Sequence, residues 1–491
     1  MKIISSTILA CLCLVSSAQD FKEKYRPQFH FTPPANWIND PNGLLYYKGN
    51  YHLYYQSNPF GNVWGHMSWS HATSKDLIHW QHLPVAIPEE KNYMIFSGSA
   101  VADKTNTTGF ATKPGQVPVV AMYTANAEAN QSQHLAYSFD EGKTFTQYAG
   151  NPVLDLHKRD FRDPGVFWYA PSKKWMVAVV LPFEHQVQFY SSVNLKKWSL
   201  ESSFGPLGDT SGVWECPQLI QAPVAGVSGK KKWVLYISMN STMQYYVGEF
   251  NGKTFVNENP ADKISRPDYG SDYYAAIAYN NLPADKTPVT IGWINNWQYA
   301  NEIPTYPWKG AMSLPRNISV QKINNEWVLI QKPVSGFETL RKQVYATDKL
   351  VVTGTKSLPV QSQVLELEAD LTTATTAGIQ LAAGNGHSIL IGYDAVQQKL
   401  FIDRTNSGDN SFSKTYPAIS KKEVSLVPEN NRIYLHIYYD KSIVEVFANG
   451  GKVAMTAQLF PDVKDNGVNL YSADGTTVFE HVKIWTLGSV H

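Results

Sequence analysis

The chain has 491 residues, and its 42 basic and 41 acidic side chains leave a formal net charge of +1. This length exceeds that of one small domain and is enough for two sizeable hydrophobic cores. The even balance, without a long block of like charge, argues against nucleic acid or an anionic membrane as a partner and favours a neutral, polar substrate. Aromatic residues make up 13% of the chain, which suits an all-β protein and also stacking against sugar rings.

The first residues are typical of a secretory signal peptide. Lys2 supplies the positive charge, residues 3–15 form an apolar core, and small residues follow up to Ala18. We therefore expect residues 1–18 to be removed by a cut after Ala18, and the protein to be secreted or periplasmic. A lipid anchor at Cys11 is the less favoured alternative, because only a short apolar run precedes it. No other segment approaches the roughly 20 apolar residues that a transmembrane helix needs.

One segment layout recurs through the first two thirds of the chain. An aromatic strand leads into a turn with Ser and Asp or Asn, and a basic residue and an aromatic residue follow. Five such segments end in Trp80, Phe145, Trp198, Phe255 and Trp327. These aromatics recur about 50 to 70 residues apart, slightly long for a four-stranded propeller blade with its loops. The repeat predicts a five-bladed β-propeller catalytic domain over residues 19–335.

Polar residues recur in phase with this repeat. Counting about 17 residues forward from each closing aromatic reaches another polar side chain, and an earlier acid can head the first blade. The resulting set is Asp40, Ser97, Asp163, Glu215 and Asp272. The first strand of every blade lines the axis of a propeller, so we expect these residues to converge on one funnel.

The pattern changes after Trp327. A connector leads into strands in which apolar and polar residues alternate, as in the segment from Ile433 to Tyr439. Short strands with Gly and Asn turns predict a C-terminal β-sandwich over residues 336–491, with a short linker at its start. Asp403 and Glu445 lack a matching constellation of acids and are interpreted as surface or structural residues, and His436 as a structural histidine.

Three acids stand in stiff local motifs and could carry out glycoside hydrolysis, which needs a protonated carboxyl and an ionised one. Glu215 lies between Trp214 and Cys216-Pro217, whose apolar character is expected to raise its pKa and to suit proton donation. Asp40, between two asparagines, is expected to stay ionised and act as the nucleophile. Asp163 follows Arg162, which favours its charged form and suits it to stabilising positive charge on the sugar.

Metal chemistry is the competing interpretation of the same acids, since carboxylates suit calcium or magnesium. The sequence has no acid-rich loop with closely spaced ligands, no Gly-rich phosphate loop and no Gly-x-Ser-x-Gly elbow. We therefore predict neither a metal nor a cofactor.

The motifs together resemble glycoside hydrolase family 32, the invertase, inulinase and levanase group. The resemblance extends nearly from end to end and includes Trp37-Ile38-Asn39-Asp40-Pro41-Asn42-Gly43, Trp64-Gly65-His66-Met67-Ser68-Trp69, Phe96-Ser97-Gly98-Ser99, Arg162-Asp163-Pro164, Trp214-Glu215-Cys216-Pro217, Gly292-Trp293-Ile294-Asn295-Asn296-Trp297 and Asp403-Arg404-Thr405. It implies a five-bladed propeller plus a β-sandwich, and hydrolysis of terminal β-D-fructofuranosides with retention of configuration.

The resemblance also implies residue roles. Asp40 would be the nucleophile, Glu215 the acid/base and Asp163 the stabiliser of the transition state, with about 5 Å between the carboxyls of Asp40 and Glu215. The implied substrate-binding residues are Trp37, Asn39, Gln56, Trp64, Phe96, Ser97, Arg162, Asp272 and Trp297.

Two departures from the family pattern are visible. Gln218 stands where many members carry an acid, and residues 240–243 lack the acid and lysine that plant invertases use near the glucose unit of sucrose. We therefore favour a secreted enzyme that removes fructose from fructan ends and also acts on sucrose. A fructosyltransferase and an endo-acting fructanase on the same site are the alternatives, and a non-catalytic carbohydrate-binding propeller is the alternative from another class. The sequence sets no expectation for the oligomeric state.

Overall fold

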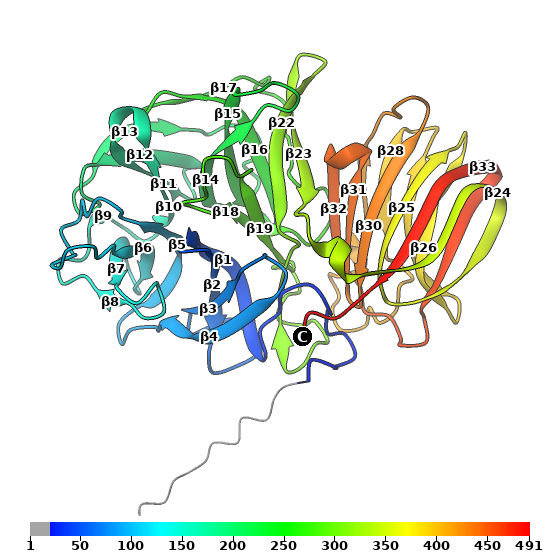
Figure 1. Ribbon diagram of the computed structural model, residues 1–491, viewed down its shortest axis with the longest axis horizontal. Coiled ribbons are helices and arrows are strands. Elements are labelled where there is room, and N and C mark those ends of the chain that lie inside the picture. The colour runs from blue at the N-terminus through cyan, green and yellow to red at the C-terminus, as the bar shows by residue number, and fades with distance from the viewer. Residues whose placement is uncertain (1–19) are drawn as a thin grey trace, which may run out of the picture.

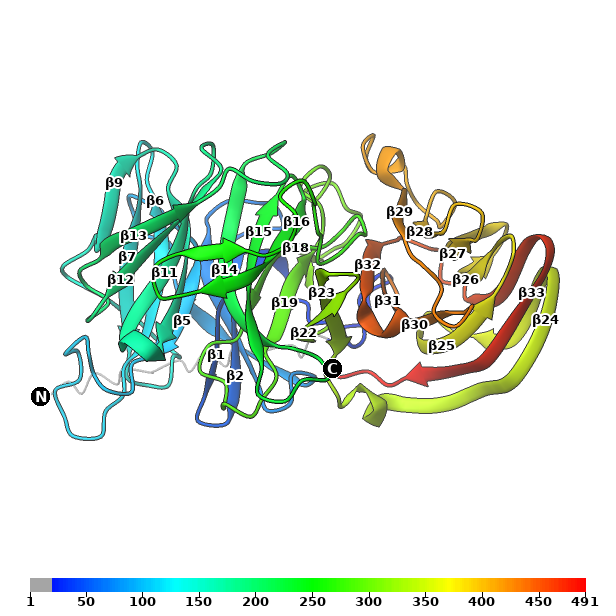
Figure 2. The ribbon, with the colours of Figure 1, turned by 90° about the horizontal axis from the view of Figure 1, so that it is seen from above.

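The structure, a computed structural model, describes residues 20–491 apart from the side chains of residues 343 and 344. It is nearly all β and consists of a five-bladed propeller followed by a β-sandwich, which lie side by side (Figure 1, Figure 2). The predicted fold class is therefore confirmed. The proposed signal peptide and Cys11 lie outside the described residues. Within residues 20–491, no helix is both long enough and apolar enough to cross a membrane.

Each blade is an antiparallel sheet whose strands follow one another in the chain. Blade 1 contains β1 (Asn36–Tyr47), β2 (Asn50–Asn58), β3 (Ser68–Ser74) and β4 (Trp80–Ile87). Blade 2 contains β5 (Met94–Ala102), β6 (Val119–Asn126), β7 (Gln131–Ser138), β8 (Thr146–Gln147) and β9 (Leu154–Lys158). Blade 3 contains β10 (Arg162–Tyr169), the short helix η1 (Ala170–Ser172), β11 (Lys174–Leu181), β12 (Gln186–Ser192) and β13 (Ser199–Phe204). Blade 4 contains β14 (Trp214–Pro223), β15 (Lys231–Met239), β16 (Thr242–Phe250) and β17 (Phe255–Asn257). Blade 5 contains β18 (Tyr274–Ala278), β19 (Val289–Ile294), β21 (Ala311–Met312), β22 (Arg316–Ile323) and β23 (Glu326–Pro333).

The first strands of the blades form a closed ring. β1 contacts β5, β5 contacts β10, β10 contacts β14, β14 contacts β18, and β18 returns to β1. The ring is also closed by β20 (Trp308–Lys309), which comes from the end of the propeller and pairs in parallel with β1. Apolar clusters fill the space between neighbouring blades, so that residues far apart in sequence are held at one axis.

The repeated aromatics mark the outermost strand of every blade. Trp80 and Phe255 begin β4 and β17, Phe145 and Trp198 directly precede β8 and β13, and Trp327 is the second residue of β23. In the turns before them, Ser, Asp or Asn side chains accept hydrogen bonds from backbone N–H groups that have no strand partner, as Ser138 accepts from Gly142 and Asp140 from Lys143. The turn chemistry therefore explains why the repeat is visible in the sequence.

The C-terminal domain is a sandwich whose two sheets share long bent strands. Its elements are η2 (Phe337–Leu340), β24 (Arg341–Gln361), β25 (Val364–Thr372), β26 (Thr376–Gly384), β27 (His387–Asp394), β28 (Lys399–Asp403), η3 (Pro417–Ile419), β29 (Lys421–Ser425), β30 (Ile433–Asp440), β31 (Ile443–Ala448), η4 (Asn449–Gly451), β32 (Val453–Gln458) and β33 (Gly467–Leu487). The first part of β33 pairs with β26 and its second part with β25. On its other edge, β33 pairs with β24 along both parts. The alternating apolar residues of β30 point into the core between the sheets.

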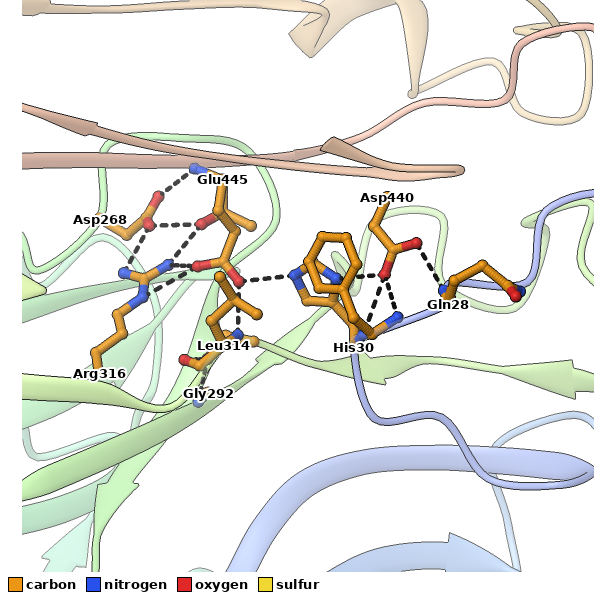
Figure 3. A network of polar contacts seen from close by, with 11 residues as sticks. Gln28, His30, Asp268, Gly292, Leu314, Arg316, Asp440 and Glu445 are labelled. Atoms are coloured by element: carbon orange, nitrogen blue, oxygen red, sulfur yellow. Dashed lines mark hydrogen bonds and ion pairs between the residues drawn. The ribbon is translucent and has the colours of Figure 1, made fainter. Parts of the chain in front are cut away.

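A buried polar network joins the two domains (Figure 3). His30, in the segment before β1, lies 2.9 Å from Asp440 Oδ2 and 3.0 Å from Glu445 Oε1 of the sandwich. Glu445 also accepts a hydrogen bond from Arg316 Nε of β22, at 3.1 Å, and Arg316 Nη1 reaches Asp268 at 3.0 Å. Glu445, which the sequence analysis interpreted as a surface or structural residue, is therefore buried and structural.

Candidate active site

All five innermost strands contain the same β-bulge. In each of them three residues advance along the strand while the partner strand advances by two, so that one extra residue is inserted. The flanking residues are Ile38 and Pro41 in β1, Ile95 and Gly98 in β5, Arg162 and Gly165 in β10, Glu215 and Gln218 in β14, and Tyr274 and Ile277 in β18. Because a bulge bends the strand and redirects side chains, this repeat turns the polar residues of four strands toward the axis.

The three predicted acids meet at this point. Asp40 on β1, Asp163 on β10 and Glu215 on β14 line one cavity of about 210 Å³. The other lining residues are Asn39, Gln56, Trp64, Met67, Phe96, Ser97, Arg162 and Trp297. Convergence from three blades is what the phase of the repeat predicts, and it places seven of the nine expected substrate-binding residues at the same cavity.

Asp40 is buried and well supported. The Ser97 hydroxyl donates to Asp40 Oδ2 at 2.7 Å, and the Asn39 amide donates to Oδ1 at 3.2 Å. The Cys216 thiol lies 3.4 Å from the same Oδ2 and 3.7 Å from Asp163 Oδ2. Asp163 additionally accepts the backbone N–H of Cys216 at 2.9 Å, so the bulge of blade 4 holds the acid of blade 3.

Glu215 has charged and polar neighbours. Arg162 donates to Glu215 Oε1 from Nε at 3.1 Å and from Nη2 at 3.0 Å, and the Tyr274 hydroxyl donates to Oε2 at 2.5 Å. Arg162 also pairs with Asp160 at 2.8 Å. The expectation of an apolar setting for Glu215, drawn from Trp214 and Cys216, is therefore wrong, because residues next to it in sequence point elsewhere.

The carboxyl electrostatics also differ from the prediction. Burial raises the pKa of Asp163 to about 7, since the nearby charge of Arg162 lowers it less than burial raises it, and Glu215 and Asp40 raise it further. Burial likewise raises the pKa of Asp40, against the hydrogen bond from Ser97. The pairing with Arg162 therefore does not lower the pKa of Asp163 as expected, whereas the expectation that Asp40 is ionised stays a prediction. One arginine faces three crowded carboxyls, so the cavity favours a substrate that develops positive charge.

Two expected substrate contacts lie outside the cavity lining. Trp37 is fully buried, donates through Nε1 to Asn39 at 2.8 Å and packs against Trp297. It therefore supports two lining residues from behind. The carboxylate of Asp272 accepts hydrogen bonds from Arg404 and from the backbone of Gln458 in the sandwich.

The position of Asp272 has a simple cause. Counted from the bulge, Tyr274 of blade 5 is the equivalent of Glu215 in blade 4 and of Arg162 in blade 3. Asp272 precedes Tyr274 by two residues and lies before β18 begins. Asp40, Ser97, Asp163 and Glu215, in contrast, all fall within the bulges of their strands. The count from the closing aromatics missed this because the loop before β18 differs in length.

A second hollow of about 430 Å³ adjoins the cavity and shares Glu215 and Trp297 with it. Its other lining residues are Gly212, Val213, Asn240, Ser241, Tyr274 and Gln298. The sequence reasoning did not single out Tyr274, Met67 or Gln298, which lie outside recognisable acid motifs. Tyr274 could have been found by aligning the blades on their bulges.

Two other features of the described residues are alternative candidates for a functional site. A hollow of about 960 Å³ between blade 5 and the sandwich is larger, but none of the three acids lines it. Glu366, Glu368 and His436 place three possible metal ligands within 4.8 Å of one another on the sandwich. The guanidinium of Arg341 already pairs with Glu366 of this cluster. The convergence of acids therefore identifies the candidate active site.

Comparison with known proteins shows the family to which the chain belongs. The model of the glycosyl hydrolases family 32 N-terminal domain matches residues 30–333, and that of the family 32 C-terminal domain matches residues 336–486. The chain is 42% identical to a levanase of Bacillus subtilis, over 99% of this chain and 74% of the relative. It is 39% identical to an extracellular exo-inulinase of Aspergillus niger, over 99% of both. The crystal structure of an exo-inulinase from Aspergillus awamori is similar with a TM-score of 0.91 and 38% identity, covering 96% of this chain and 100% of that one. The chain therefore belongs to glycosyl hydrolases family 32 and is a glycoside hydrolase.

Proposed function

We propose that the protein is a β-fructofuranosidase that releases fructose from the ends of levan or inulin chains and also hydrolyses sucrose. The observation that carries this proposal is the cavity of about 210 Å³ that holds Asp40, Asp163 and Glu215 together. A cavity of this size accommodates about one sugar ring, which favours attack at a chain end. The adjoining hollow shares Glu215 and can receive the rest of the substrate. The named relatives act on the same class of polymer.

The reaction proceeds by double displacement. Asp40 attacks the anomeric carbon while Glu215 gives its proton to the departing glycosidic oxygen, which leaves a fructosyl ester on Asp40. Glu215 then takes a proton from water, the resulting hydroxide attacks the anomeric carbon, and the Asp40 carboxylate is released. Asp163 accepts hydrogen bonds from sugar hydroxyls and stabilises the positive charge on the ring. The retaining path requires about 5 Å between the carboxyls of Asp40 and Glu215.

Time-resolved product analysis on sucrose, inulin and levan tests this function, with wild type and Asp40→Ala in parallel. We expect free fructose as the only early product from the two polymers, and its loss in Asp40→Ala. The relative rates on inulin and levan measure the linkage preference. Full activity in Asp40→Ala would show that another residue is the nucleophile.

The same experiment separates the alternatives. Early oligosaccharides from the polymers indicate endo cleavage, while longer products at high sucrose concentration indicate a fructosyltransferase. Binding without turnover by the wild type indicates a carbohydrate-binding propeller. Glu215→Gln complements the series, because removal of the proton donor slows cleavage of a poor leaving group more than that of a good one.

We further propose that the chain is exported and processed after Ala18, as its signal-like N-terminus and the extracellular relatives suggest. Mass spectrometry of the exported protein tests this. A mature N-terminus at Gln19 supports the proposal, and a lipid-modified Cys11 contradicts it.

A further inference from the structure

The loop between β19 and β20, residues 295–307, borders both hollows of the candidate active site, and we call it the rim loop. Its Trp297 lines the cavity with the three acids and also the adjoining hollow. Its Asn301 accepts a hydrogen bond from the backbone N–H of Trp64, an exposed aromatic residue that also lines the cavity, at 3.0 Å. The rim loop therefore contacts two aromatic residues of the cavity wall, of which Trp297 also lines the adjoining hollow.

The inner side of the rim loop rests on the sandwich. Tyr299 and Ile303 belong to one apolar cluster with Tyr416 and Phe460 of the second domain. The rings of Tyr299 and Tyr416 meet edge to face, with 5.2 Å between their centroids. Such packing fixes the base of the loop but leaves Trp297 half-buried at the substrate side.

A buried arginine fixes this contact. Arg404, which follows β28 of the sandwich, is 1% exposed and donates to Asp272 Oδ2 at 2.5 Å and to the Tyr299 hydroxyl at 2.9 Å. The Tyr299 hydroxyl in turn donates to Asp272 Oδ1. Arg404 also donates to the backbone oxygen of Gln458 at 2.8 Å. Three side chains from the propeller, the rim loop and the sandwich thus form one closed ring of hydrogen bonds.

This ring places two charged groups in a buried position. Taking a guanidinium and a carboxylate out of water is expensive, and apolar residues of similar volume often stabilise a protein as well. Charged hydrogen bonds, however, specify one geometry, because the N–H groups of the planar guanidinium donate only in fixed directions. The ring is therefore suited to holding the rim loop in one place.

We infer that Arg404 of the sandwich domain is a positioning residue for the leaving-group side of the active site, acting through Asp272 and Tyr299 on Trp297. The inference rests on the proposed function, because it assigns the hollow shared by Glu215 and Trp297 to the part of the fructan that departs. The second domain then contributes to catalysis on long substrates although it carries none of the three acids. A substrate whose leaving group is too small to reach Trp297 does not depend on this contact.

The test compares two substrates with Tyr299→Phe and Arg404→Lys. Tyr299→Phe keeps the ring packing and removes only the hydroxyl, and Arg404→Lys keeps the charge but loses the fork. For a linear fructan tetrasaccharide we expect KM to rise about tenfold, because small misplacements of positioning groups have effects of this order or more. For methyl β-D-fructofuranoside we expect kcat and KM to change less than about twofold. Tyr299→Phe also answers the question if Arg404→Lys does not fold.

Two controls separate this inference from the proposed function. Arg316→Lys alters another buried arginine that joins the propeller to the sandwich, and we expect a lower Tm with an unchanged ratio of kcat/KM between the two substrates. Asp40→Ala is expected to lose both activities, which tests the proposed function alone. Equal losses on both substrates in Tyr299→Phe, or no loss on either, would overturn the role of Arg404 while leaving the hydrolysis itself established.

Discussion

Asp163 occupies the most crowded position among the three acids. It is buried, it lies near Asp40 and Glu215, and the backbone N–H of Cys216 donates to it. Arg162 precedes Asp163 in the sequence, but its side chain donates hydrogen bonds to Glu215. A site that is short of positive charge is unfavourable for the free enzyme and favourable for a transition state with oxocarbenium character. Part of the stability of the protein is thus exchanged for activity.

This exchange predicts the pH dependence of an Asp163→Asn variant. Burial raises the pKa of Asp163 to about 7 in the folded protein, so between about pH 4 and pH 7 the folded state holds a proton that the unfolded chain releases. Stability must therefore fall as the pH rises through this window. We expect Asp163→Asn to be inactive, to match the wild type near pH 4, and to be more stable at about pH 8 by on the order of a few kcal/mol. Urea unfolding at both pH values measures the difference.

Asp76→Asn is the control for this measurement. Burial raises the pKa of Asp76, but hydrogen bonds from His79 and Ile78 lower it to about 2. The contribution of Asp76 to stability therefore changes between about pH 2 and 4, so Asp76→Asn should differ from the wild type by nearly the same amount at about pH 4 and at about pH 8. An Asp163→Asn variant that is less stable than the wild type at alkaline pH would contradict the assignment of Asp163 as a strained acid.

The five bulges are the feature that connects the propeller to its chemistry. Positive φ values at Asp163, Cys216 and Ala275, of 64°, 49° and 52°, fall at the same place in three successive blades. An inserted residue in this conformation turns the neighbouring side chains toward the axis. The blade framework therefore supplies one bulge per blade, and the residue types within the bulge decide its chemistry.

The same comparison shows what the sequence could predict. Aromatic residues after turns that contain Ser, Asp or Asn located the blades, because turn chemistry is local and is visible in the residue types. The convergence of Asp40, Asp163 and Glu215 followed from the repeat. Contacts across blades did not follow, because the partner of Arg162 is set by a bulge that leaves no mark in residue spacing. For the same reason Asp272 was assigned to the cavity and not to the domain interface.

Close approach of two innermost strands predicts the effect of Gly165→Ala. A Cβ atom on Gly165 of β10 would lie 2.5 Å from the backbone oxygen of Pro217 in β14, closer than such contacts occur. The variant must push apart the strands that carry Asp163 and Glu215. We expect a loss of about 1–3 kcal/mol in the free energy of unfolding and a lower kcat, measured by urea unfolding and by fructose release.

Gly488→Ala is the matched control for this variant. Its nearest neighbour to an added Cβ, the backbone oxygen of Leu340, lies at 3.8 Å, an ordinary contact. We expect wild-type stability and activity. If Gly165→Ala behaved like Gly488→Ala, the two strands would be free to separate without disturbing the acids.

At the scale of the whole molecule, the two domains are joined by charge as well as by apolar packing. Arg316 and His30 on the propeller side meet Glu445 and Asp440 on the sandwich side, and all four are buried (Figure 3). Removing one partner from such a network leaves the other charge buried and unpaired, which costs about 3–5 kcal/mol. The stability of the domain interface, which also includes the contact of Arg404 with the rim loop, therefore depends on the protonation of His30.

His30→Gln tests this dependence. Burial lowers the pKa of His30, but Asp440 and Glu445 outweigh it and raise the pKa to about 9. The unfolded histidine titrates near 6.5, so the contribution of His30 to stability is complete below about pH 6.5 and is lost as the pH rises to about 9. We expect the wild-type Tm to fall across this window and the Tm of His30→Gln to be lower at about pH 6 and nearly flat.

His52→Gln provides the comparison within the same fold. Burial lowers the pKa of His52 to about 4, so this histidine is almost fully neutral in both states above about pH 7.5 and adds almost no slope between about pH 7.5 and 9. A variant at His52 should keep the wild-type slope in that window, whatever its effect on the absolute Tm. If the wild type and His30→Gln lost stability in parallel between these pH values, His30 would be neutral at the interface, and Asp440 and Glu445 would have to be held by backbone donors and Arg316 alone.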